Sequence, residues 1–489
     1  MHKRKGLPMS FGGRGKNFIV IVATFLFFFF IFGLECPLRA SDPYSAYYST
    51  DNDKIFWFIL MSDVHIGALG YPGSEHLEWM VTEAKDVINP SFIVNAGDLT
   101  DSTNWSELGY PDGPHIEEWQ QYRDIVVSNG MDESFYYDIP GNHDHYGDKN
   151  FAYYLNYSIQ GAATGQTQIS WTRTFGFGTY HFLGINTCGN DGAEFSLFPP
   201  TYGDNAGLDA SELAFIGSEL EANKNADLTL IFGHHLIVKR ATDWTDVSSE
   251  DVEAWTMTAL IYGADEFIAL MDAYNPLMYA YGHSHVYREE FFTKDMANGV
   301  LYLNVASLAK SDSNHYNIVA IDCNGISTAP QNVGTWPAVI ITAPLDRNLG
   351  MADDPYTSAV TDLTGASTPI RALVFDKNPV TQVEYRTYKI LEPCGRFVDR
   401  VVRRVTGLLE QEGIWHPMTQ VAPGHPYYPY LWETDCPNPL AGGEYTIEVR
   451  AKGSSTQTDS IPTAFPAPPV DDAGAAGCFI TTAACDSLR

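Results

Sequence analysis

Five short polar motifs lie between residues 63 and 285 and together carry the side chains needed to bind two divalent metal ions. They are Asp63-Val64-His65, Gly97-Asp98-Leu99-Thr100-Asp101, Gly141-Asn142-His143-Asp144, Gly233-His234-His235 and Gly282-His283-Ser284-His285. Carboxylate oxygens and imidazole nitrogens suit Mn, Fe or Zn, and no motif contains a thiolate. Two such ions about 3.5 to 4 Å apart acidify a shared water, which can attack a phosphorus centre. The residue types therefore predict metal-assisted hydrolysis of a phosphate ester.

Each motif follows a run of β-forming apolar residues, although the last of these runs is weaker than the others. The runs cover residues 55–60, 92–94, 135–137, 228–232 and 277–280. In an α/β sheet, ligand-binding side chains gather where the strands end. A single motif of this kind is common by chance, whereas five in succession behind strands are not. We therefore expect all five motifs to meet at one edge of the sheet structure.

In order and composition, the motifs resemble the calcineurin-like metallophosphoesterase superfamily over residues 55–322. The resemblance implies a four-layer αββα sandwich of the α/β class and a centre with two divalent metal ions. It also implies a set of metal ligands: Asp63, His65 and His285 for the first metal, Asn142, His234 and His283 for the second, and Asp98 bridging both. A bridging carboxylate lowers the repulsion between the two cations.

The same resemblance implies that His143 faces the leaving group and protonates it. Asp101 follows Asp98 by three positions, where related phosphatases can carry an acid that orients this imidazole and raises its pKa. The alternative for Asp101 is a turn or helix-cap residue. For the neighbouring Asp144 and His145, and likewise for His235, we expect supporting or solvent-facing roles.

Two positions separate this chain from the purple acid phosphatases. His65 stands where those enzymes have Gly, and Asp101 stands where they have a metal-binding Tyr. A tyrosinate-bound ferric site is therefore not expected. The pattern is instead similar to the branch that contains cyclic-nucleotide phosphodiesterases, glycerophosphodiesterases and uncharacterised exported phosphoesterases. Phosphomonoesters and phosphodiesters both remain open as substrates.

The charge and the N-terminus predict the partners and the location. The 489-residue chain has a formal net charge of −31, which repels nucleic acid. A small phosphate ester, the partner that the motifs predict, would rely on the metals to overcome this negative potential. Basic residues precede an apolar run over 18–34, so residues 1–40 are predicted to be a signal peptide or an uncleaved anchor. The uncleaved anchor is the only contact with a membrane that we expect. These features predict a secreted, periplasmic or cell-surface protein of a bacterium.

The elements predicted along the chain change character near residue 334. We expect a catalytic domain over 50–333, with helices at 75–87, 116–128 and 209–222 and a hairpin at 169–185. Short strand-like runs over 334–460 predict an all-β, immunoglobulin-like sandwich, either a binding module for a cell-surface ligand or a passive spacer. Residues 461–489 form a linker and a tail with a Cys-Phe-Ile box that resembles a sorting signal.

Taken together, the motifs predict an exported phosphoesterase with a dinuclear metal centre that hydrolyses phosphomonoesters or phosphodiesters with a metal-activated water. The alternative is a catalytically idle cell-surface binding protein built on the same scaffold. The completeness of the ligand set favours the enzyme, because an idle relative would be expected to lose ligands.

Overall fold

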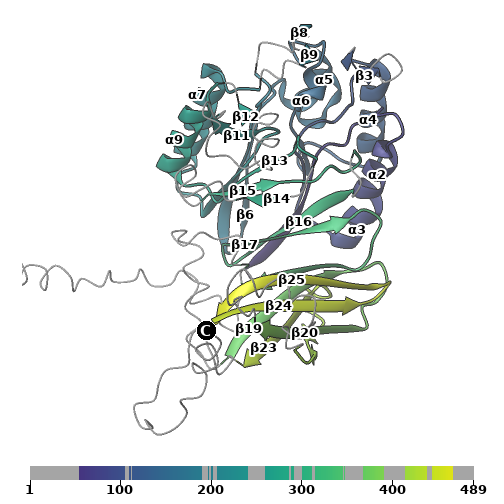
Figure 1. Cartoon of the computed structure of the whole chain (residues 1–489), viewed down its shortest axis with the longest axis vertical. Coiled ribbons are helices and arrows are strands. Elements are labelled where there is room, and N and C mark those ends of the chain that lie inside the picture. Colours follow the sequence, from purple (N-terminus) through teal and green to yellow (C-terminus); the bar gives the residue numbers. More distant parts are fainter. Residues whose placement is uncertain are drawn as a thin grey trace, which may run out of the picture.

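The fold is described from a computed structural model of the whole chain (Figure 1). The structure describes residues 54–104, 113–189, 206–239, 262–285, 300–310, 314–344, 367–389, 413–437 and 443–465. Short pieces between these ranges are also described, at 110–111, 196–197, 200–201, 259–260, 288–290 and 346. The predicted signal peptide or anchor lies outside the described residues, as do the rest of the predicted linker and the tail with its Cys-Phe-Ile box, from residue 466 onward. Residues 461–465, predicted as the start of that linker, instead continue a strand whose Ile461 is buried in a core cluster.

The first of two large mixed sheets has the strand order β17-β16-β1-β2-β5. Its strands are β1 (Ile55–Met61), β2 (Ile93–Asn95), β5 (Tyr136–Asp138), β16 (His315–Asp322) and β17 (Gly325–Asn332). Strands β1, β2 and β5 are parallel, and β16 pairs antiparallel with β1. Both faces of β1 are buried, because Phe56 and Phe58 pack toward the second sheet while Trp57 and Ile59 pack into a different cluster.

The second mixed sheet has the order β14-β15-β13-β10-β7-β6. Its strands are β6 (Ile169–Phe175), β7 (Gly178–Gly184), β10 (Leu228–Phe232), β13 (Met278–Tyr281), β14 (Arg288–Glu290) and β15 (Leu301–Asn304). Its inner face meets the first sheet in one apolar core, where Phe58 contacts Phe92, Phe182 and Phe232. The predicted hairpin forms as β6 and β7. Six short strands form three small two-stranded sheets. These are β3 (Thr103–Asn104) with β4 (Tyr110–Pro111), β8 (Ser196–Leu197) with β9 (Pro200–Thr201), and β11 (Leu236–Lys239) with β12 (Ala259–Leu260).

Helices cover the outer face of each large sheet and complete an αββα sandwich (Figure 1). The helical segments are α2 (Gly73–Trp79), η1 (Met80–Ala84), α3 (Lys85–Ile88), α4 (Ile116–Ser128), η3 (His143–His145), α5 (Ala152–Tyr157), α6 (Ile159–Thr164), α7 (Ala210–Ala222) and α9 (Ala264–Tyr274). Leu77 and Trp119 share a core cluster with Ile59 of the first sheet. Ile216 and Phe267 pack with Ile231 of the second sheet. The predicted fold class of the catalytic region is confirmed.

The helices follow the signals in the sequence closely. The stretch predicted at 75–87 is helical from Gly73 to Ile88 with a wider π-type turn at Met80–Ala84, and the other two predicted helices are α4 and α7. Asp209 caps α7, because its Oδ1 accepts hydrogen bonds from the N–H groups of Ser211 at 2.9 Å and Glu212 at 2.8 Å.

The C-terminal part contains two four-stranded antiparallel sheets that face each other as a β-sandwich. Their orders are β18-β19-β23-β22 and β21-β20-β24-β25. The strands are β18 (Ala338–Ala343), β19 (Ser367–Phe375), β20 (Gln382–Lys389), β21 (His416–Pro417), β22 (Thr419–Gln420), β23 (Leu431–Pro437), β24 (Gly443–Lys452) and β25 (Thr456–Phe465). The core between the two sheets contains Val339, Ala372, Val374 and Ile447. An all-β sandwich was predicted here, and its immunoglobulin-like character and its ligand stay predictions.

The β-sandwich packs directly against the first sheet and its helices. Trp57 of β1 contacts the rings of Phe375, Tyr427 and Tyr430 at centroid distances of 5.5, 6.0 and 5.6 Å. The Ile55 N–H donates to the Tyr427 hydroxyl at 3.0 Å. One hydrophobic cluster therefore contains residues from both parts of the chain. The predicted division at residue 334 remains a boundary in the sequence, but the apolar packing crosses it.

Candidate metal centre

Ligands from three of the motifs sit in a backbone conformation that few side chains adopt. Asp63, His65, Asp98, His283 and His285 have φ angles of 54°, 49°, 53°, 68° and 60°. Left-handed φ is uncommon for residues other than Gly and persists only where the surrounding structure imposes it. The concentration of such residues at the strand ends indicates that the loops are shaped for the positions of these side chains.

Two of the motif glycines allow backbone and ligand to approach closely. A Cβ at position 141 would lie 2.2 Å from Asp98 Oδ1, and one at position 282 would lie 2.4 Å from Asp63 Oδ2. Both distances are far below a van der Waals contact. Gly141 and Gly282 are therefore needed for the carboxylates to reach the centre, which explains why Gly begins these motifs.

The ligand atoms predicted for the first metal converge on one point. His65 Nε2 lies 3.1 Å from His285 Nε2 and 3.9 Å from Asp63 Oδ1, and His285 Nε2 lies 3.2 Å from the same Asp63 oxygen. Asp98 Oδ2 lies 3.6 Å from His65 Nε2. A metal with bonds of about 2.0 to 2.2 Å holds its ligand atoms about 3 to 4 Å apart. The spacing of this set fits one ion.

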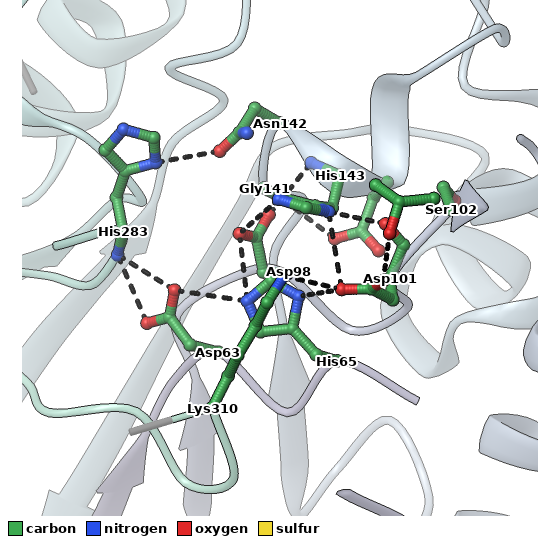
Figure 2. A network of polar contacts seen from close by, with 12 residues as sticks. Asp63, His65, Asp98, Asp101, Ser102, Gly141, Asn142, His143, His283 and Lys310 are labelled. Carbon is green, nitrogen blue, oxygen red and sulfur yellow. Dashed lines mark hydrogen bonds and ion pairs between the residues drawn. The ribbon is translucent and has the colours of Figure 1, made fainter. Parts of the chain in front are cut away.

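The ligand atoms predicted for the second metal form an adjacent set, of which Figure 2 shows Asp98, Asn142 and His283. Asn142 Oδ1 lies 3.1 Å from His234 Nε2 and 2.9 Å from His283 Nδ1. Asp98 Oδ2 lies 3.2 Å from His234 Nε2. These separations again match the ligand shell of one ion. The structure thus brings all the predicted ligands together in two sets.

Asp98 joins the two sets through a single atom. Its Oδ1 accepts the His143 N–H at 2.9 Å, which leaves Oδ2 facing His65 on one side and His234 on the other. Burial alone would raise the pKa of the Asp98 carboxyl, but His234 and His143 outweigh it and hold this pKa well below its usual value. Oδ2 is therefore the Asp98 atom that faces both ligand sets, which is where the predicted bridging role would place it.

Hydrogen bonds to residues outside the two sets orient two of the predicted ligands. The Nδ1–H of His234 donates to the Ala96 carbonyl at 2.8 Å, so the lone pair of Nε2 faces Asn142 and Asp98. The Nδ2 of Asn142 donates to the Tyr146 hydroxyl at 2.7 Å, which turns Oδ1 toward the imidazoles. Each of these contacts leaves the metal-binding atom facing the centre.

The donor set fits a pair of divalent ions. Carboxylate, amide and imidazole donors from buried strand ends suit Mn, Fe or Zn, and the centre as described contains no sulfur. The same carboxylates favour positive charge at the meeting point of the nitrogens. Although burial lowers the pKa of His234, Asp98 raises it by more, to about 9. Divalent ions would supply that positive charge in place of protons.

Asp101 contacts two histidines with different groups (Figure 2). Its Oδ1 lies 3.0 Å from His65 Nδ1, whereas its main-chain carbonyl accepts a hydrogen bond from His143 Nδ1 at 2.5 Å. The same Oδ1 is 3.8 Å from His143 Nδ1. The carboxylate therefore contacts the predicted ligand His65, and the predicted orientation of His143 comes mainly from the backbone. The other carboxylate oxygen accepts a hydrogen bond from Thr103 Oγ1, a contact typical of the turn residue that was the alternative for Asp101.

His143 lies at the mouth of the centre, with its side chain 14% exposed and Nε2 4.0 Å from Asp98 Oδ2. Burial lowers the pKa of His143 to about 3; Asp98 and Asp101 oppose this, while His65 and Lys310 act with it. The rise that Asp101 was expected to cause is thus smaller than the effect of burial. The free protein holds this imidazole neutral at pH 7, and a bound anion beside it would favour its protonated form.

Two further residues of the motifs, Asp144 and His235, and the adjacent His145 take supporting positions. Buried Asp144 accepts hydrogen bonds from the N–H groups of Leu99, Thr100 and Gly141 at 2.9 to 3.1 Å, so it fastens the second motif to the third. His145 stacks on Phe151 at 4.3 Å. His235 Nδ1 contacts Thr187 Oγ1 at 2.9 Å, and burial lowers its pKa well below the usual value.

Sequence reasoning missed Lys310, whose Nζ lies 2.7 Å from Asp101 Oδ1. It follows β15 and lies beyond the last motif. A lysine in a polar stretch is most often a surface residue, and nothing in the local pattern distinguishes this one. Its contact depends on how the loop after β15 meets the second motif, which no spacing along the chain reveals.

Comparison with known proteins identifies the class. Residues 56–287 match the family model described as calcineurin-like phosphoesterase. The chain therefore contains a domain of this family, as the five motifs predicted. The matched range contains all of the predicted ligands, whereas Lys310 and the β-sandwich lie beyond it.

Two curated relatives and one solved structure are similar to this chain. Transmembrane protein 62 of Mus musculus is 26% identical over 362 residues, which cover 72% of this chain and 50% of that protein. An Arabidopsis thaliana protein named as a candidate metallophosphoesterase is 30% identical over 115 residues, 22% of this chain and 15% of that protein. A purple acid phosphatase from yellow lupin (Lupinus luteus) seeds aligns with a TM-score of 0.38 and 13% identity, covering 57% of this chain and 52% of its own. The chain spans half or less of the length of the two curated relatives.

The mouse relative corrects one prediction. A secreted, periplasmic or cell-surface location was expected, but a protein that matches most of this chain is named as a transmembrane protein. The expectation rested on a basic and then apolar N-terminus, a pattern that export signals share with membrane-spanning segments. Among the residues that the structure describes, no helix is long and apolar enough to cross a membrane.

Proposed function

We propose that this protein is a phosphoesterase with a dinuclear metal centre, which hydrolyses small phosphomonoesters or phosphodiesters with an activated water. The observation that carries the proposal is the shared position of Asp98 Oδ2, 3.6 Å from His65 Nε2 in one ligand set and 3.2 Å from His234 Nε2 in the other. A single carboxylate oxygen that faces two ligand sets could contact both ions of a metal pair.

The centre would divide the chemistry between metals and protein. When bound, the two ions would acidify a water and neutralise charge on the phosphoryl group. Asp63, Asp98 and Asn142 would hold them through oxygen atoms, with the imidazoles completing both sets. His143 is fixed by the Asp101 carbonyl at Nδ1, so its Nε2 is available to the leaving group. The negative charge of a bound phosphate would favour protonation of that imidazole.

Hydrolysis of two chromogenic esters tests the proposal. The full chain would be stripped of metal with a chelator, reloaded with Mn or Zn, and assayed on nitrophenyl phosphate and bis-nitrophenyl phosphate. We expect chelation to abolish turnover and reloading to restore it, because the metals supply the nucleophile. The ratio of the two rates distinguishes a monoesterase from a diesterase. Full metal occupancy without turnover on either ester would instead favour the idle binding protein.

Replacing His143 should separate metal binding from proton transfer. In His143→Ala we expect unchanged metal content and a loss in kcat of about 10² to 10⁴ on alkyl phosphates, whose leaving groups need a proton. The loss on nitrophenyl esters should be much smaller. Steady-state kinetics on both substrate types, with metal analysis of the same samples, provides the measurement. His416→Ala, on the exposed strand β21, is the control. Equal losses on both substrate types would refute the role of His143 as an acid.

A further inference from the structure

The loop between β15 and β16 is fastened to the first motif. The Leu308 N–H donates to the Ser62 carbonyl at 2.9 Å, and the Leu308 carbonyl lies 2.8 Å from His76 Nδ1. Ser307 Oγ donates to the Asp63 carbonyl at 2.8 Å and accepts the N–H of Lys310 at 2.7 Å. The backbone at Lys310 is thus held by contacts to the residues that carry the first metal's ligands.

The side chain of Lys310 extends from this loop into the centre (Figure 2). It is 11% exposed, and its Nζ lies 2.7 Å from Asp101 Oδ1, which is itself fully buried. The other oxygen of Asp101 accepts a hydrogen bond from Thr103 Oγ1. Since Oδ1 is also 3.0 Å from His65 Nδ1, one carboxylate oxygen meets both the ammonium group and the imidazole.

We propose that Lys310 is a positioning residue for the first metal, acting through Asp101 on His65. A carboxylate behind a metal-binding histidine fixes the ring so that the other nitrogen faces the metal, and such partners strongly affect metal affinity. Here the carboxylate is itself held by Lys310 from one side and by Thr103 from the other. This inference rests on the proposed dinuclear centre and adds a residue that lies outside the matched family range.

The geometry restricts the effect to one of the two ligand sets. His65 belongs to the first set, whereas Asn142 and His234 of the second set are oriented by other partners. Loss of the Lys310 ammonium would leave Asp101 Oδ1 with one neighbour fewer and would let the carboxylate turn away from His65. The second metal would keep its ligands and their contacts.

Metal affinity measured by chelator competition tests this inference without reference to turnover. Wild-type full-length protein loaded with Zn should give two dissociation constants. We expect Lys310→Met to weaken one of them by about 10- to 100-fold, the usual effect of removing a contact behind a metal ligand. Lys310→Arg, which keeps the charge, should recover part of the loss. Lys377→Met, which removes an exposed lysine 3.3 Å from Glu83, is the matched control and should change neither constant.

Two companion variants identify which metal is affected. In His285→Ala, which lacks a ligand of the first set, adding Lys310→Met should leave the remaining dissociation constant unchanged. In His283→Ala, which lacks a ligand of the second set, the same addition should raise the dissociation constant of the remaining metal. Equal effects in both backgrounds, or no effect of Lys310→Met in otherwise wild-type protein that is folded by circular dichroism, would overturn the inference. If wild-type protein binds two ions but hydrolyses no ester, the proposed function fails while these affinities still decide the role of Lys310.

Discussion

Asp98→Asn should lose metal from both sites at once and reduce kcat/KM by at least about 10³-fold, because one oxygen serves both ligand sets. Asn suits the test better than Ala. It tolerates the left-handed φ of 53° found at this position, and its amide oxygen can still accept the His143 N–H. The substitution therefore removes the bridging charge while keeping the loop. Metal content after dialysis and the hydrolysis rate of both nitrophenyl esters would be measured on the same sample.

The control for this prediction is Asp132→Asn, at an exposed turn where the carboxylate accepts hydrogen bonds from Ser134. It should keep both metals and full activity. Asn142→Ala provides a second comparison, since it should weaken the binding of one metal only. If Asp98→Asn retained one tightly bound ion with normal affinity, the bridge would not be needed for that site, and the shared role of Oδ2 would be refuted.

Much of the fold could be predicted because burial and secondary structure leave local marks in the sequence. The run Ile55–Met61 is apolar at every position, which a strand buried on both faces requires. Asp209 followed by Glu212 marks the start of α7. Helix α9 was not predicted, although Phe267 and Met271 recur at helical spacing and both are buried. Its signal was present but short.

The residues that meet at the centre could also be predicted, because their types and order are fixed by chemistry that short motifs record. Which atom of each residue makes each contact could not be predicted. That Asp98 uses Oδ2 for both sets follows from the His143 N–H holding Oδ1. That Asp101 orients His65 with its carboxylate and His143 with its carbonyl depends on the path of the backbone around position 101. These distinctions arise from tertiary contacts, which local patterns do not encode.

The relation between the two parts of the chain was the least predictable feature. A change from mixed elements to short strands indicated a second domain, and a passive spacer was one alternative for it. In the structure, Trp57 of the catalytic sheet lies against Phe375 and Tyr430 of the C-terminal part. Since these aromatic residues share one core cluster, we infer that the two parts stabilise each other and that the catalytic region is not independent of the β-sandwich.

The buried ion pair at this interface gives the largest stability effect that we expect. Arg371 of β19 lies 3.1 Å from Asp322 of β16, with side chains 6% and 0% exposed. Burial raises the pKa of Asp322 and Arg371 opposes that rise. Arg371→Met removes the opposing charge and leaves a buried carboxylate, which should lower the free energy of unfolding by about 3–5 kcal/mol. Denaturant unfolding of the full chain at fixed metal concentration is the measurement.

Two further variants make this prediction specific to the interface. Arg371→Met combined with Asp322→Asn should recover most of the lost stability, because no unpaired charge remains. Arg386→Met breaks a pair with Glu448 on the partly exposed face of the β-sandwich, and it should cost only about 0–1 kcal/mol. Because the core is shared, the single variant should shift the unfolding of both parts together. A separate early transition of the β-sandwich, with the catalytic region unchanged, would contradict the inference that the two parts depend on each other.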